Sequence, residues 1–421
     1  MLIKKMKSLA IAFFQWPVAI CLLPLYGVLA LIVRAFKQRR KVPRLCWGPI
    51  PIISNNYWSA AMKEKGYPSF TLMENYFSAI NKRQNFDRYF TDFIPDTGIS
   101  MVDQSLIYFR PYIVFIYVLL KADILHFSFN GFVLYRTVLK TLEPHLYALA
   151  GIKTVVIPFG ADFYQYSLLS DPTLKQALLL SYPGMAKKER QIRTNIHRWT
   201  QYADCIVGSF HLDGLGRWDV LPFVPFMLDA EVWKQKSHYS NSDGKREPVV
   251  ILHCPNHTGF KGTEFIVQAI QNLKQKGYLI EFRQLQNIQN EKVREHFQQA
   301  DILVEQLLAN TYSLNAIEGM ASGLAVIANL EPTPSIRLFQ RYSYAGSCPI
   351  VSASIETLEM QLEALIIDPK KRQEIGNRSR IYVEKYHSYA AAQLLFESIY
   401  QKIWYKKDIE LMRLYQNPGL D

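Results

Sequence analysis

Short apolar runs alternate with segments of helical periodicity along most of the chain. In the first half, the runs at 122–129 (ADILHFSF), 153–160 (KTVVIPFG) and 203–210 (ADCIVGSF) are rich in branched residues and end in polar or glycine-containing turns. Helix-period segments lie between them, at 137–150 and 187–202. Because strands that alternate with helices form parallel sheets covered by helices, this pattern predicts a doubly wound α/β domain.

A second alternating unit follows the polar segment 237–248 (SHYSNSDGKREP), which has no apolar periodicity and which we interpret as an interdomain linker. The strands predicted in this unit are 249–254, 278–285, 301–306 and 324–329. The helices predicted in it are 262–276, 291–299 and one around Glu318, and a last long helix near 387–405 follows the unit. A chain of 421 residues suits two domains. Two such sheets facing each other create a cleft at their carboxyl ends, where open α/β sheets bind ligands.

The N-terminus carries an uninterrupted apolar segment. No charged residue occurs from Ser8 to Val33, and this exceeds the roughly 20 residues that a helix needs to span a bilayer. Basic residues flank the segment on both sides: Lys4, Lys5, Lys7, Arg34, Lys37, Arg39, Arg40 and Lys41. The heavier basic flank is on the C-terminal side, which places the following domains in the cytoplasm. We therefore predict a membrane anchor.

The N-terminal segment has two other interpretations, a cleaved signal peptide and a re-entrant helix. A cleaved signal peptide usually has a shorter apolar core and a small-residue cleavage site, which is missing before the basic cluster. Pro17 and Pro24 leave open a kinked helix that enters one leaflet and returns. The second apolar stretch, 111–120, is too short to span and is interpreted as a buried helix or strand of a soluble domain.

The net charge, the cysteines and the missing motifs exclude several classes of function. The net charge of +12 suits nucleic acid or an anionic membrane, but no zinc-finger, basic-zipper or RNP-like pattern occurs, so the membrane is the expected partner and nucleic acid is not. The five cysteines are scattered, without a CxxC pair, which argues against a disulfide framework or a zinc site. The chain has no D-x-D, G-x-S-x-G, P-loop or H-E-x-x-H pattern, so we expect no metal.

The segment 310–329 (NTYSLNAIEGMASGLAVIAN) places one carboxylate, Glu318, among small residues about two turns into a predicted helix. The helix is expected to begin near Thr311–Ser313, where its free N–H groups and its dipole favour a diphosphate. A carboxylate at Glu318 could accept hydrogen bonds from two ribose hydroxyls. The alternative is a solvated glutamate, with the small residues serving only helix–sheet packing.

A second segment, PNHTGFKGTEF, follows the strand at 249–254 and places Lys261 and Gly262 just before a helix. A lysine beside glycines at such a turn can neutralise a phosphate. A solvated turn is the alternative for this motif taken alone. Both segments, however, lie at strand carboxyl ends of the same predicted sheet, which favours a shared phosphate site.

Three motifs, KGTEF at 261–265, ADILVEQ at 300–306 and AIEGMASGLAVIAN at 316–329, resemble the second domain of the retaining glycosyltransferases of family four, which have the GT-B fold. The resemblance covers the second domain, and more loosely the first. It implies that Lys261 binds the donor diphosphate and Glu318 the ribose. The implied nucleotide-sugar contacts are Lys261, Gly262, His257, Thr311, Tyr312, Ser313, Leu314 and Glu318.

The chain departs from the family pattern at two points. The earlier glutamate of the family's pair falls on Asn310, which can hydrogen-bond a sugar but cannot carry the negative charge. The family's arginine upstream of the lysine falls near Pro255, and His257 is the nearest substitute.

In the first domain, the family's H-x-H pattern corresponds to His126 and Ser128, and its G-x-D turn to Gly160 and Asp162. With Asn310, the implied catalytic residues are His126, Ser128 and Asp162. For the histidine, a core or capped residue at a strand end is the alternative, and for the G-x-D turn it is a plain turn.

Taken together, these features predict a membrane-anchored, metal-independent, retaining glycosyltransferase of the cell inner membrane with cytoplasmic catalytic domains. The expected partners are a nucleotide-sugar co-substrate, without a further cofactor, and a lipid-linked or glycan acceptor. The alternatives are a non-catalytic GT-B scaffold of a polysaccharide assembly complex and, less favoured, a sugar epimerase. The predicted organisation is a membrane anchor with basic flanks (1–41), an N-terminal Rossmann-like acceptor domain (42–236), the linker (237–248), a C-terminal Rossmann-like nucleotide-sugar domain (249–385), and a helix and tail (386–421).

Overall fold

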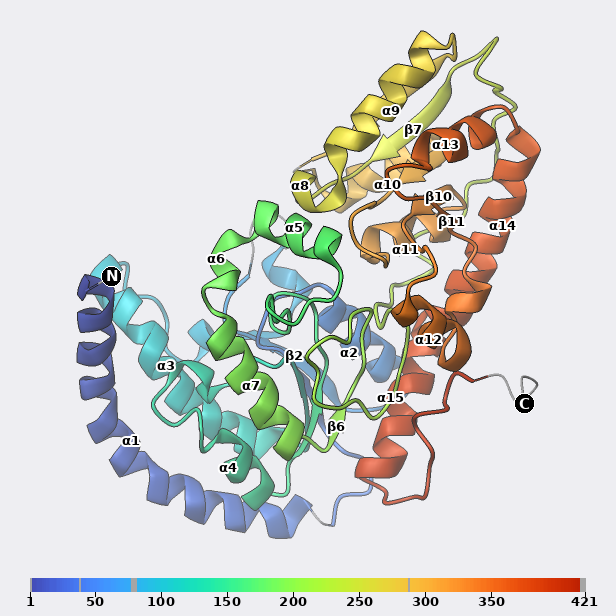
Figure 1. The fold of residues 1–421 in the computed structure, drawn as a ribbon. Coiled ribbons are helices and arrows are strands. Elements are labelled where there is room, and N and C mark those ends of the chain that lie inside the picture. Colours follow the sequence, from blue (N-terminus) through green and yellow to red (C-terminus); the bar gives the residue numbers. More distant parts are fainter. Residues whose placement is uncertain (1, 38, 77–81, 287, 417–421) are drawn as a thin grey trace.

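Two separate parallel sheets organise the chain (Figure 1). The computed structural model describes residues 2–37, 39–76, 82–286 and 288–416, with side chains from Phe13 onward. The first sheet has the strand order β3-β2-β1-β4-β5-β6 and the second the order β11-β10-β9-β7-β8. All recorded pairings within them are parallel, which confirms the predicted α/β class.

Most strands of both sheets are buried, as expected when helices cover a parallel sheet. The strands of the first sheet are β1 (Leu45–Trp47), β2 (Ser69–Met73), β3 (Arg88–Tyr89), β4 (Ile124–Phe127), β5 (Lys153–Val156) and β6 (Cys205–Ile206). Those of the second are β7 (Val249–His253), β8 (Ile280–Gln284), β9 (Ile302–Val304), β10 (Ala325–Ala328) and β11 (Val351–Ser352). The predicted strands correspond to β4–β10, and residues 237–248 contain no helix or strand.

The helices follow the strands in the alternating order that the sequence predicts. The first part of the chain contains α1 (Leu2–Lys37), α2 (Ser54–Glu64), α3 (Ser100–Lys121), α4 (Glu143–Leu149), α5 (Pro172–Ser181), α6 (Pro183–Ala186) and α7 (Glu189–Tyr202). The second contains α8 (Thr258–Lys261), α9 (Thr263–Gln275), α10 (Asn290–Gln299), α11 (Leu314–Ala321), α12 (Pro334–Tyr342), α13 (Leu358–Ile366), α14 (Pro369–Tyr386) and α15 (Tyr389–Ile403). Short 3-10 turns occur at Arg83–Asn85, Phe90–Asp92, Leu134–Arg136 and Ala345–Ser347. The apolar stretch 111–120 lies inside α3, whose core-facing side chains are buried.

Helix α1 lies along the outer edge of the first domain, beside α3 and near α4 (Figure 1). Within the described residues, its segment Phe13–Lys37 is long and apolar enough to cross a membrane. It nevertheless packs against the domain, because Tyr26, Ala30 and Val33 belong to the same core cluster as Phe115 of α3.

The last helix, α15, returns from the second domain and packs on α2 of the first (Figure 1). Its residues Phe396 and Tyr400 share a core cluster with Trp47 and Trp58. Gln393 also donates a hydrogen bond to the Ala61 carbonyl of α2. The first domain is therefore completed by a segment from the far end of the chain.

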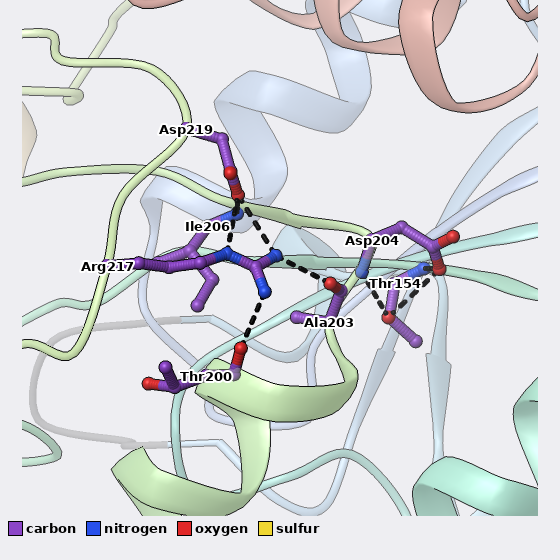
Figure 2. A network of polar contacts seen from close by, with 7 residues as sticks. All are labelled: Thr154, Thr200, Ala203, Asp204, Ile206, Arg217 and Asp219. Atoms are coloured by element: carbon purple, nitrogen blue, oxygen red, sulfur yellow. Dashed lines mark hydrogen bonds and ion pairs between the residues drawn. The ribbon is translucent and has the colours of Figure 1, made fainter.

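A polar network fixes the exit from β6, where the chain leaves the first sheet (Figure 2). The guanidinium of Arg217 donates to the carbonyls of Thr200 and Ala203, which satisfies acceptors at the C-terminal end of α7. The Asp219 carboxylate accepts from Arg217 and from the backbone N–H of Ile206. These bonds hold the connection toward the second domain against the end of the sheet.

Candidate active site

A cavity of about 490 Å³ lies between the two domains. Its first-domain wall comes from the loop after β5 and from the α5–α6 segment, and its second-domain wall from the loops after β7 and β9. The lining residues are Ile52, Phe159, Gly160, Ala161, Tyr164, Tyr166, Leu178, Tyr182, Met185, Phe210, Phe226, Asn256, His257, Phe260, Lys261, Gln306, Thr311, Tyr312 and Ser313. Many of the lining side chains are aromatic, and Lys261 is the one charged residue in this lining at neutral pH, because burial and then the Lys261 charge lower the pKa of His257.

Lys261 ends α8, the short helix that follows β7, and its side chain is buried. Its ammonium group donates to the carboxylate of Glu305, to Gln306 Oε1 at 2.9 Å and to Ser313 Oγ at 3.1 Å. Ser313 Oγ in turn donates to Glu305 at 2.7 Å. An ammonium has three protons, so the side chains of its own domain satisfy Lys261 completely.

Ser313 is also the N-cap residue of α11, so the first N–H groups of this helix lie next to Lys261. Gln306 is held by its own donation to the Thr311 carbonyl at 2.8 Å. The structure thus brings a buried ammonium group and the positive end of a helix dipole together at one wall of the cavity. This arrangement can neutralise a phosphate group.

Glu318, on the fifth residue of α11, is buried and does not line the cavity. Burial raises the pKa of its carboxyl to about 8, against the opposing effects of Asn315 and Arg294. Its charge also contributes, after burial, to raising the pKa of Tyr57 to about 12. Since Tyr57 belongs to α2, Glu318 faces the first domain.

Cys254 connects the two predicted nucleotide contacts. It follows β7, and burial, followed by the charge of Glu318, raises the pKa of its thiol to about 12. Glu305 and Lys261 also act on this thiol, with smaller effects. Lys261 and Glu318 therefore both lie near enough to Cys254, at the carboxyl end of the second sheet, to act on its thiol.

The remaining predicted contacts of the second domain are placed as follows. His257 lines the cavity, and its ring meets the Tyr182 ring of the first domain edge-on at 4.6 Å. Gly262 adopts φ +76°, a left-handed conformation that favours glycine, where α8 ends and α9 begins. Thr311 and Tyr312 line the cavity, but the Tyr312 hydroxyl is occupied by hydrogen bonds to Tyr382 and His387. Leu314 opens α11 outside the lining.

Asn310 lies outside the cavity lining. Its amide donates to Asn329 Oδ1 at 2.9 Å, and Asn329 donates to the Leu307 carbonyl at 2.8 Å. The amide group at this position therefore links the loop after β9 to the end of β10.

The three first-domain residues are held by other parts of the protein. His126 is fully buried, stacks on Trp47 with ring centroids 3.6 Å apart, and is bonded at both nitrogens, to Cys46 O and to Tyr400 Oη. Burial lowers the pKa of His126 to about 3, so the ring is neutral. Ser128 lines a separate small cavity of about 10 Å³ that it shares with Phe159.

Asp162 is buried and accepts hydrogen bonds from the backbone N–H groups of Phe129, Phe159 and Gly160. Burial raises the pKa of its carboxyl to about 6 in spite of these bonds. The carboxylate ties the loops after β4 and β5 together, and Gly160 of this loop lines the main cavity. Asp162 thus shapes the cavity wall without lining it.

Glu305 and Gln306 were not singled out from the sequence, and neither were the aromatic residues of the cavity wall. Glu305 and Gln306 end the predicted strand 301–306. In an α/β fold, polar residues at the carboxyl end of a strand face the ligand side. That rule could have found Glu305 and Gln306. The aromatic side chains of the wall are scattered along the chain: Phe159, Tyr164 and Tyr166 follow β5, Tyr182 lies between α5 and α6, Phe210 and Phe226 follow β6, Phe260 lies in α8, and Tyr312 precedes α11. No local sequence pattern connects them.

Comparison with protein-family models and with curated proteins found no match. Among solved structures, the chain is similar to sucrose-phosphate synthase from Thermosynechococcus elongatus, with 13% identity and a TM-score of 0.54 over 87% of this chain and 100% of that chain. It is also similar to WaaG, a glycosyltransferase involved in lipopolysaccharide biosynthesis, with 12% identity and a TM-score of 0.44 over 85% and 98% of the two chains. The catalytic domain of starch synthase IV from Arabidopsis thaliana matches with 11% identity and a TM-score of 0.45 over 86% and 99%.

At 13% identity, the similarity to sucrose-phosphate synthase shows the fold alone. Two parallel-sheet α/β domains that face a cavity are the GT-B architecture, and the predicted fold class is confirmed.

Proposed function

We propose that this protein is a glycosyltransferase that moves a sugar from a nucleoside-diphosphate sugar to a lipid-linked or glycan acceptor at a membrane. One observation carries the proposal: the Lys261 ammonium group and the start of α11 converge on one wall of the interdomain cavity. The fold is shared with proteins whose names describe sugar transfer or synthesis. The acceptor would enter from the first-domain side.

In the proposed mechanism, Lys261 and the N–H groups of α11 stabilise the diphosphate as it leaves, so that no metal is required. Glu318 would accept hydrogen bonds from the ribose. We further propose that the anomeric configuration is retained and that the reaction serves surface polysaccharide synthesis at the inner membrane, with both domains in the cytoplasm. The family resemblance of the 316–329 motif supports these finer points.

The first test is a calorimetric titration of purified protein with uridine and guanosine diphosphates, followed by incubation with radiolabelled nucleotide-sugars and membrane lipids. Lys261→Met should weaken diphosphate binding by about tenfold or more, because a charge-assisted contact is lost. Lys274→Ala, at an exposed position of α9, is the matched control and should leave binding unchanged. Because Lys261→Met also leaves Glu305 buried without its cation, thermal melting must show that the variant is folded.

A non-catalytic scaffold is the second candidate, and two contacts favour it. Lys261 already has three internal acceptors, and Asn310 replaces an acid and is bonded to Asn329. A scaffold would bind neither nucleoside diphosphate, and Lys261→Met would then change no ligand affinity. Saturable binding together with sugar transfer to any lipid fraction would exclude it.

A further inference from the structure

Helix α1 turns three polar groups toward the domain, between small and branched apolar side chains, and most of its large apolar side chains outward. Gln15, Tyr26 and Lys37 are buried, and they are spaced eleven residues apart, which is three helical turns. They therefore form one stripe on the side that faces the domain. A surface helix of a water-soluble protein has the opposite arrangement.

Each residue of this stripe makes a hydrogen bond with the domain. Gln15 Oε1 accepts from the Tyr112 hydroxyl at 3.1 Å and from the Val138 N–H at 2.9 Å. The Tyr26 hydroxyl donates to the Tyr112 carbonyl at 2.7 Å. Lys37 Nζ donates to the Ala122 carbonyl at 2.7 Å. The helix is thus attached to the domain over about 33 Å, the rise of the residues between the first and last bond.

The outward face of α1 is a continuous apolar surface. Its large side chains are each between 49% and 73% exposed, and they are Phe13, Phe14, Trp16, Ile20, Leu25, Val28, Leu31, Ile32 and Phe36. Exposed apolar patches of this extent mark sites that another apolar phase covers. The free energy of leaving them in water is unfavourable, at about 25 cal/mol per Å².

The attachment constrains how a membrane can cover this face. The hydrogen-bonded length of α1 is about the thickness of a bilayer core. If this length crossed the bilayer, α3 and α4, which pack along it, would have to enter the hydrocarbon as well. Helix α3 carries the Arg110–Asp96 ion pair and belongs to the folded first domain.

We propose that α1 lies flat in the interface of an anionic bilayer, bonded to the first domain on one side and inserted by its apolar face on the other. Charge complementarity supports a lipid surface, because exposed basic residues continue from the end of the helix: Arg34, Arg39, Arg40 and Lys41. This refines the membrane association in the proposed function, but it uses none of the cavity residues.

A second copy of the chain is a less favourable occupant of this face. The sequence is basic at both ends of α1, with Lys4, Lys5 and Lys7 in its first two turns and Arg34 and Arg39 to Lys41 at its C-terminal end. Parallel or antiparallel pairing of two such helices would therefore place like charges side by side.

Flotation with lipid vesicles tests whether a bilayer covers the apolar face of α1. Wild-type protein should float with vesicles made of equal parts phosphatidylcholine and phosphatidylglycerol, and less with phosphatidylcholine alone. The face variant Ile20→Ser/Val28→Ser/Leu31→Ser should lower the vesicle-bound fraction by about tenfold or more. A matched control changes exposed apolar residues of α13, α14 and α15, Met360→Ser/Ile381→Ser/Leu394→Ser, and should float like wild type. Equal flotation of the face variant, or a wild-type dimer in light scattering that this variant dissociates, would overturn the proposal.

Cysteine labelling tests the orientation, in protein with Cys21, Cys254 and Cys348 replaced by serine. Lys5→Cys lies in the first turn of α1 and Lys41→Cys lies just beyond its C-terminal end, and Lys274→Cys reports the side that holds the second domain. In sealed proteoliposomes, a membrane-impermeant maleimide should label all three positions to the same extent. A spanning helix would give opposite labelling of Lys5→Cys and Lys274→Cys and would refute the flat orientation. Diphosphate affinity, measured in detergent, should be unchanged in the face variant, so failure of this proposal is distinguishable from failure of the catalytic one.

Discussion

The ammonium group of Lys261 donates to three acceptors of its own domain, so a phosphate must replace at least one of them. Glu305 is the acceptor that carries a negative charge, and one of its oxygens, Oε2, is buried without a hydrogen-bond partner. A carboxylate in this position competes with an incoming diphosphate for the same cation. The Glu305 carboxylate therefore neutralises the charge of buried Lys261, and this ion pair lowers the affinity of the site for a diphosphate.

Glu305→Gln removes this competition with little change in shape. We expect nucleoside diphosphates to bind about tenfold more tightly, since tenfold corresponds to roughly 1.4 kcal/mol and one charge-assisted contact contributes about 1.5–3 kcal/mol. The same change should lower the free energy of unfolding, because Lys261 loses its counter-charge. Calorimetric titration and urea unfolding measure the two effects, with Glu331→Gln, at an exposed position after β10, as the control. Weaker diphosphate binding by Glu305→Gln would show instead that Glu305 positions the lysine for its ligand.

The buried carboxyl of Glu318 gives a prediction about pH. Burial raises its pKa from the ordinary value of 4.5 to about 8, so the folded protein keeps a proton that the unfolded chain loses. Stability that is present below the unfolded pKa is therefore lost as the pH rises toward 8. Relative to Glu318→Gln, which cannot ionise, the wild-type free energy of unfolding should fall by an amount on the order of a few kcal/mol between about pH 5 and about pH 8. Urea unfolding at several pH values measures the difference, and parallel pH profiles for the two proteins would contradict it.

The returning helix α15 sets the environment of His126. Tyr400 donates to His126 Nε2 at 2.8 Å, and both residues are fully buried. Tyr400→Phe leaves that nitrogen unpaired and should destabilise the protein by about 1–3 kcal/mol. Nucleotide affinity should not change, since neither residue lines the cavity. Chemical unfolding and calorimetry separate the two effects, with Tyr342→Phe, half-buried on α12, as the control. A loss of affinity at unchanged stability would support the predicted role of His126 in the site.

The sequence pattern predicts those helices and strands that are long enough to show a periodic arrangement of apolar residues. Strands β4 to β10 and the helices α4, α7, α9, α10, α11 and α15 lie where the apolar runs and helical periods place them, whereas α5, α6 and α8 were not predicted. Strand β1 was missed because its three residues follow the basic flank and show no alternation. Strand β2 and helix α2 were missed as well, since no prediction was made between the flank and residue 111.

The residues of the candidate site that lie in local turns could be predicted from the sequence. Lys261 and Ser313 lie at strand-to-helix junctions, and such junctions are visible in the sequence. The partners of His126 and Tyr312 come from α15 and from the segment between α14 and α15, which no local pattern connects to them. The inward polar stripe of α1 was not predictable for the same reason. Its hydrogen-bond partners belong to α3, the residue after α3 and the segment before α4, which are distant in the sequence.

At the scale of the whole molecule, the two domains meet across the cavity through α5 and α8. The Tyr182 ring contacts the His257 ring, and α8 passes so close to α5 that a Cβ atom built on Gly259 would lie 3.2 Å from Leu180 Cβ. This contact lies directly beside Lys261, the last residue of α8. Separation of the domains would open the cavity at the proposed phosphate site.

A cross-link at this contact tests whether ligand entry requires the domains to separate. In Leu180→Cys/Gly259→Cys the two Cβ atoms lie near the distance found in disulfides, so oxidation should join α5 to α8. If the domains must separate before the ligand enters, a cross-link that holds α5 to α8 opposes this step. We therefore expect the oxidised protein to bind nucleoside diphosphate at least about tenfold more slowly, because a required conformational change lowers the association rate. A reducing agent should restore the rate, and each single cysteine variant should be insensitive to oxidation. Stopped-flow fluorescence measures the rates, and a non-reducing gel measures the cross-linked fraction. Unchanged association kinetics in fully cross-linked protein would mean that the cavity admits its ligand while the domains stay closed.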